Sequence, residues 1–99
     1  MKNFIELLKT YCNLKGYEEL EQEGFDLVLQ KQVDDHIFKI SVSKEPASKG
    51  IFSLEILNSE QNVEAFANMR TSEFLDFNDH IDLSFDILYN GIKYTHLQS

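Results

Sequence analysis

Apolar residues recur through the first fifteen positions at the three- and four-residue spacing of an amphipathic helix. They are Phe4, Ile5, Leu8, Tyr11 and Cys12. Lys15 and Gly16 follow as a basic last turn and a glycine suited to end a helix. The pattern predicts a helix over residues 3–15.

Two later segments alternate apolar and polar residues with the period of half-buried strands. The first begins at Phe25 and the second ends at Val42, with Asp34-Asp35 between them as a two-residue turn. That turn pairs Val33 with His36, Lys31 with Phe38, Leu29 with Ile40 and Leu27 with Val42. The predicted hairpin therefore collects nearly all of its large apolar side chains on one face.

A third strand is predicted over 51–57, where apolar residues again alternate with polar ones. After it, Asn58 and Gln61 have the spacing of a helix cap, and Val63, Phe66 and Ala67 would share a face of a short helix. An extended conformation of 63–69 is the alternative. The sequence leaves helix or strand open for residues 59–80.

The last segment combines alternation with a turn signal. Leu83, Phe85, Ile87 and Tyr89 occupy alternate positions, Asn90-Gly91 is a strong hairpin turn, and Ile92 and Tyr94 follow on the same face. Two closing strands are therefore predicted. The expected fold is α+β: one domain, 1–99, with an antiparallel sheet of about five strands, an N-terminal helix and a second helix packed on one face.

Charge narrows the classes of partner. The chain has 99 residues with 17 acids against 9 bases, a formal net charge of −8. Such acidity repels nucleic acid and anionic membranes and favours a basic protein surface. There is no apolar run of membrane-spanning length and no export signal, and the single cysteine precludes an intrachain disulfide. We expect a cytoplasmic protein, and the oligomeric state stays open.

The sequence offers no motif for catalysis or for a cofactor. Cys12 lies on the apolar stripe of the first helix, where a structural thiol is expected rather than a nucleophile. His36, His80 and His96 lie near carboxylates, but no metal-ligand spacing or phosphate-binding glycine motif accompanies them. Solvated turns explain these histidines better than a metal site. We predict no catalytic residue, no metal and no cofactor.

Ten acids fall in two blocks without Lys or Arg, and they are the predicted partner-binding residues. The first block is Glu18, Glu19, Glu21, Glu23 and Asp26, and the second is Glu73, Asp76, Asp79, Asp82 and Asp86. In extended chain, alternate residues of each block would form a row on one face. Such rows can imitate the phosphates that a nucleic-acid enzyme binds, and they would steer a basic partner.

The simpler interpretation is that both blocks are solvated faces. Four aromatic residues interleaved with the acids favour binding, because aromatic anchors inside a charged rim are typical of tight interfaces. They are Tyr17, Phe74, Phe77 and Tyr89. Core positions for these aromatics would weaken that interpretation.

With these acidic blocks the chain resembles the small immunity proteins and inhibitors of bacteria that neutralise a toxin, often a basic nuclease, by covering its active site. The resemblance implies a cognate toxin or effector as partner and no enzymatic activity of its own. Antagonists of bacterial nucleic-acid defence enzymes share this profile. The expected order of helix, three strands, helix and two strands is also similar to the acidic secretion chaperones, although this expected order lacks their closing helix. That alternative implies a dimer that binds an extended client segment.

Overall fold

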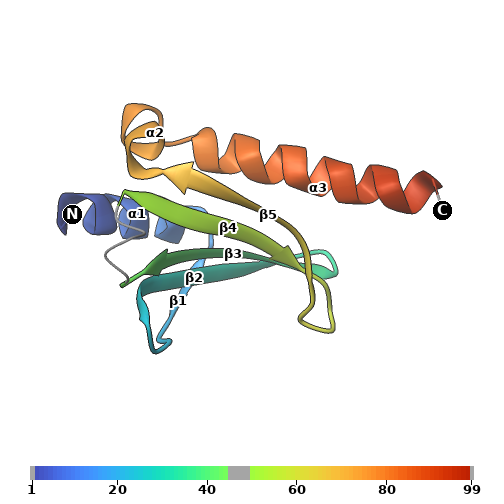
Figure 1. Ribbon diagram of the computed structural model, residues 1–99, viewed down its shortest axis with the longest axis horizontal. Coiled ribbons are helices and arrows are strands. Elements are labelled where there is room, and N and C mark those ends of the chain that lie inside the picture. The colour runs from blue at the N-terminus through green and yellow to red at the C-terminus, as the bar shows by residue number, and fades with distance from the viewer. Residues whose placement is uncertain (1, 45–49, 99) are drawn as a thin grey trace.

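The computed structural model describes residues 2–44 and 50–98, in which one helix is followed by five strands and then two helices (Figure 1). The elements are α1 (Lys2–Leu14), β1 (Glu18–Leu20), β2 (Phe25–Val33), β3 (His36–Ser43), β4 (Ile51–Leu57), β5 (Val63–Arg70), α2 (Thr71–Asp76) and α3 (His80–Gln98). The strands form one antiparallel sheet in sequence order, with β1 and β5 at its edges. The α+β prediction is confirmed.

The central hairpin has the predicted register. Val33 pairs with His36, Leu29 with Ile40 and Leu27 with Val42, and β3 pairs in turn with the predicted strand β4. Asp34, in the turn, has a φ of 53°, which asparagine and aspartate tolerate better than most residues. The sequence pattern was sufficient here because large side chains on one face leave only one register that buries them.

The segment after β4 is a strand, so the helical interpretation of residues 58–67 is wrong and the extended alternative is right. Ala65, Ala67 and Met69 alternate on the inner side of β5, while Phe66 points to solvent and is 65% exposed. Small alanines at two of the three inward positions made the alternation weak. β1 is a three-residue strand with every residue exposed, which left no apolar period to recognise.

The two predicted closing strands are wrong, because residues 80–98 form the single helix α3. Its core side carries Ile81, Phe85 and Ile92, which are buried, with half-buried Leu88 between them. These residues have helical spacing, and the apparent alternation arose because α3 has a second apolar stripe on its opposite side. Asn90-Gly91 has a local preference for a turn. Packing of α3 on the sheet outweighs this preference, so the helix continues across both residues.

All three helices contribute to one core on a single face of the sheet. Phe4 and Leu8 of α1, Phe74 of α2 and Phe85 of α3 belong to one buried cluster with the inward side chains of β2, β3, β4 and β5. The ring of Phe85 stacks on Phe38 with centroids 4.6 Å apart. The expected order of helix, three strands, helix and two strands is thus replaced by one helix, five strands and two helices.

Candidate protein-binding surfaces

The first acidic block follows the β1 edge of the sheet. Strand β1 ends at Leu20, so the predicted row of alternate glutamates is not formed, and Glu21 and Glu23 lie in the turn before β2. Glu19 is paired with Lys9 of α1, with Nζ and Oε2 3.6 Å apart. Within the described ranges, the side chains of Glu18, Glu21, Glu23 and Asp26 are exposed and form no ion pair. We call these four residues the acidic edge.

The second block lies on helices rather than on the predicted strands. Glu73 is in α2, where its Oε1 accepts a hydrogen bond from the Arg70 backbone N–H at 3.1 Å and so satisfies a donor at the helix start. Asp82 and Asp86 are one helical turn apart on α3 instead of neighbours along an extended row. In Figure 1 α2 lies at the top of the molecule and the β1–β2 turn at the bottom, so the structure does not merge the two blocks.

A hydrogen-bonded cluster connects the second block to α1. The Tyr11 hydroxyl lies 2.8 Å from both Asp79 Oδ1 and Asp82 Oδ2, and Lys15 Nζ lies 3.1 Å from Asp82 Oδ2. Burial, and then the hydrogen bonds to Asp82 and Asp79, raise the pKa of Tyr11 well above 10. The hydrogen bond to Asp82 raises the pKa of Lys15. This cluster fixes the start of α3 against the end of α1.

The Tyr11 hydroxyl cannot satisfy both carboxylates of the cluster, those of Asp79 and Asp82. A hydroxyl carries a single proton, so Tyr11 can donate to only one of the two carboxylates at a time. Lys15 already reaches Asp82. Asp79 is exposed and therefore keeps acceptor capacity that a cation from outside can use.

Exposed apolar side chains lie among these acids at the connection between α2 and α3. Leu75 and Phe77 are 47% and 48% exposed, and Asp76 stands between them. The Phe77 ring contacts the His80 ring edge-on, with centroids 5.2 Å apart, which holds it in place. We call Glu73, Leu75, Asp76, Phe77 and Asp79 the acidic corner.

Of the four aromatic residues considered as anchors, only Phe77 is available to a partner. Tyr17 and Phe74 are buried in the core, and Tyr89 is packed against it with its hydroxyl donating to Asp34 Oδ2 at 3.0 Å. Phe74 lies among acids in the sequence, but it is not available as an anchor because its side of α2 faces the core. Leu75, the other exposed apolar residue of the acidic corner, was not anticipated, because a half-exposed side chain at a corner gives no periodic signal.

Cys12 and His36, two of the groups weighed for catalysis or metal binding, also have structural contacts. Cys12 is fully buried, as predicted, and burial with the charge of Asp82 raises its thiol pKa to about 12, so the reactive thiolate is disfavoured. His36 Nε2 lies 3.0 Å from Glu64 Oε1, and the side chain of His96 lies outside the described residues. In the part of the chain that the structure describes, no three His, Cys, Asp or Glu residues gather as metal ligands would.

Comparison with protein families, curated proteins and solved structures finds no match to this chain. Among the described residues, α3 is the longest helix, and no helix has the length and apolar character needed to cross a bilayer. The function of this chain is therefore inferred from the residues on its surface.

Proposed function

We propose that this chain is a non-enzymatic, cytoplasmic inhibitor of the immunity-protein type, which binds a basic toxin domain, in particular a nuclease, and blocks its active site. The observation that carries the proposal is the acidic corner, where half-exposed Phe77 and Leu75 stand among exposed carboxylates. Apolar anchors within a charged rim are the arrangement from which protein interfaces draw most of their binding energy.

The two acidic surfaces would have different roles in binding. At the acidic corner, Asp79 retains acceptor capacity for a lysine or arginine of the partner, and Phe77 supplies apolar contact. The acidic edge has only the partly exposed Leu20 among its glutamates and would act mainly through its field. Long-range attraction accelerates encounter, whereas desolvated contacts slow dissociation.

The first test is capture of the partner with the tagged protein from a lysate of the cells that encode it, followed by the mass of the complex from light scattering. The proposal predicts a one-to-one pairing with a folded basic protein whose nucleolytic activity falls as this chain is added. A captured protein that keeps full activity when saturated would refute inhibition.

Two variants then separate steering from contact. Asp76→Lys should slow association, more strongly at low salt, and Phe77→Ala should speed dissociation with little change in association rate. Glu60→Lys is the matched control for charge, because Glu60 is an exposed acid of the β4–β5 turn, far from α2 in Figure 1. Equal effects of Asp76→Lys and Glu60→Lys would exclude the acidic corner from the interface.

A chaperone-like protein that holds an extended client is the second candidate. A groove of about 540 Å³ beside the edge strand β5 supports it, with Ala65, Ile87 and Ile92 in its lining. Edge strands can bind an extended segment by adding it to the sheet. Capture of a partly unfolded client, protected along β5 from hydrogen exchange, would favour this function over inhibition.

A further inference from the structure

Helix α3 has apolar side chains on two opposite sides. Its core side buries Ile81, Phe85 and Ile92. Successive helical residues are 100° apart, so residues two positions further along point almost directly away from them. Leu83 and Ile87 occupy such positions and are exposed. A surface helix normally carries polar groups on the side opposite its core stripe, so α3 has a face suited to a second packing partner.

The exposed stripe has the spacing of a coiled-coil seam. Ile87, Tyr94 and Leu97 are 73%, 64% and 83% exposed, and Leu83 is half exposed. With Asn90 they form the series Leu83, Ile87, Asn90, Tyr94 and Leu97, separated by four, three, four and three residues. The stripe extends over roughly 21 Å at the helical rise per residue.

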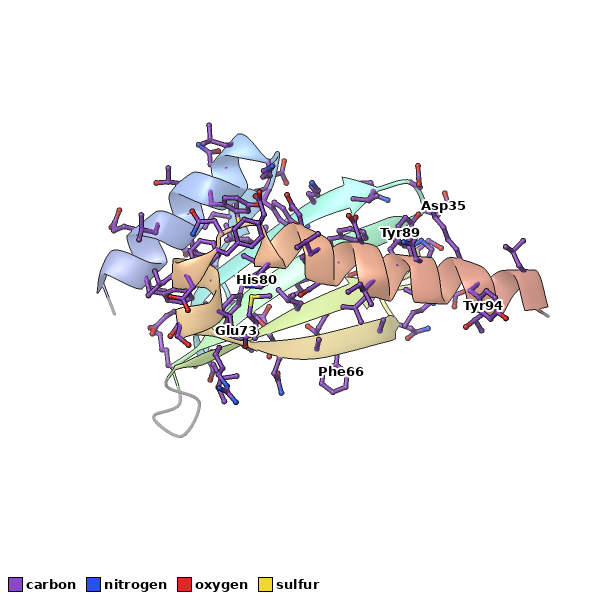
Figure 2. The ribbon with its side chains drawn as sticks, turned by 90° about the horizontal axis from the view of Figure 1, so that it is seen from above. Asp35, Phe66, Glu73, His80, Tyr89 and Tyr94 are labelled. Carbon is purple, nitrogen blue, oxygen red and sulfur yellow. The ribbon has the colours of Figure 1, made fainter. Side chains whose placement is uncertain are left out.

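This stripe is open in the fold. Figure 1 shows α3 on top of the molecule with its C-terminal part extending past the ends of the strands, and Figure 2 looks down on α3 with no other helix or strand drawn over it. Tyr94 lies on the extending part. A Cβ added at Gly91, beside the stripe, would meet nothing within 4 Å. A second helix can therefore approach α3 along its whole exposed face.

We propose that a second copy of this chain covers the stripe, with the two α3 helices packed antiparallel. In that arrangement Leu83 lies against Tyr94 of the second copy, and Ile87 lies against Asn90 of the second copy. The seam is self-complementary because the same two layers repeat on both sides of a twofold axis.

The charges that flank the seam favour the same arrangement. Asp86 and Lys93 each directly precede a seam residue and are seven residues apart, so they occupy equivalent flanking positions. Both are exposed, and Lys93 Nζ lies over the ring of Tyr89, 4.6 Å from its centroid. Antiparallel packing brings Asp86 of each copy next to Lys93 of the other, whereas parallel packing would place Asp86 beside uncharged Gly91. Charge complementarity therefore points to a second copy, although the whole chain has a net charge of −8.

The acidic edge is made by other elements, so this dimer would leave it open. The acidic corner directly precedes α3 and adjoins the end of the seam, because Leu97 of the second copy would lie at the level of His80. The inference does not depend on the proposed function, and the two can fail separately. A dimer that binds no basic partner would leave the dimer standing and remove the function.

Sedimentation equilibrium of the full chain over a wide range of protein concentration tests the inference. The parent should reach dimer mass, and Ile87→Ser should raise the dissociation constant by at least about tenfold, because each dimer loses the side chain twice. Leu14→Ser is the matched control, since Leu14 is 80% exposed on α1 and lies off the stripe. Circular dichroism of each variant would establish that it is folded.

A charge swap tests the orientation of the helices. Asp86→Lys should weaken the dimer by placing two lysines together, and the double variant Asp86→Lys, Lys93→Asp should recover the parent dissociation constant. Failure of the double variant to recover dimerisation would overturn the antiparallel arrangement. The second copy would be overturned as occupant of the stripe if the parent remained monomeric at every concentration. It would also be overturned if the parent sedimented as a monomer with neutral phosphatidylcholine vesicles. A dimer equally stable in Ile87→Ser and the parent would do the same.

Discussion

Replacement of Gly91 by alanine tests the element on which the sequence pattern and the structure disagree most. Gly91 lies within α3, is exposed, and is not among the glycines with positive φ. A Cβ at this position would meet nothing within 4 Å, so the substitution introduces no clash. Alanine loses less backbone entropy than glycine on entering a helix, and Gly91→Ala should therefore stabilise the fold by about 0.5–1 kcal/mol.

Gly24→Ala is the matched control for this prediction. Gly24 is also free of neighbours within 4 Å of a Cβ, but its φ is +90°, which alanine adopts only at a cost. The same chemical change should therefore destabilise the protein by roughly 1–2 kcal/mol at position 24. Opposite signs of the change in stability at positions 91 and 24 would identify backbone conformation as the cause.

Urea unfolding followed by circular dichroism measures both variants against the parent. A gain of about 1 kcal/mol corresponds to a rise in melting temperature of roughly 4–8 °C for a domain of this size. Repeating the measurement at several protein concentrations separates the helix effect from any effect on self-association, which alone depends on concentration. If Gly91→Ala destabilised the protein as much as Gly24→Ala does, residue 91 would have the positive φ of a hairpin turn and the helical assignment would be refuted.

Two further predictions follow from the core. Phe85→Ala should lower the free energy of unfolding in urea by about 3–5 kcal/mol, because Phe85 is buried and stacked on Phe38. Phe66→Ala should lower it little, because Phe66 is exposed. Equal losses in the two variants would show that the core face is assigned wrongly. Burial raises the pKa of the Cys12 thiol from 9 to about 12 and that of the Tyr17 hydroxyl above 10, so the folded state holds these protons more tightly than the unfolded chain. The two raised pKa values therefore contribute stability that is complete below pH 9 and should be lost as the pH rises toward 12. A free energy of unfolding that stays level from pH 8 to 11 would contradict this prediction.

The central hairpin and β4 were predictable because they are encoded locally. Alternation of large apolar residues, a two-residue turn and a single register that buries one face agree with each other between Phe25 and Leu57. The α1 stripe of Phe4, Leu8 and Cys12 is equally explicit, and the structure buries all three. The α+β class followed from these segments, although two of the expected strands were placed in the wrong part of the chain.

The order of residues places the acids along the chain, but it does not show which of them are available to a partner. Tertiary contacts decided that Glu19 pairs with Lys9 and that Asp82 is held by Tyr11 and Lys15. They also decided that Phe77 is exposed while Phe74 is buried, since this depends on which side of α2 faces the sheet.

The C-terminal segment depends most clearly on tertiary packing. Its apolar residues fit a strand pattern at positions 83, 85, 87 and 89, and they also fit two opposite stripes of one helix. Local preference at Asn90-Gly91 favoured a turn. The sheet was already complete with β1 and β5 as its edge strands, and its apolar face needed cover, so burial of Ile81, Phe85 and Ile92 outweighed that preference. Burial against a distant surface has no signature in the local pattern, and it is the physical reason that α3 is a helix with an exposed apolar face.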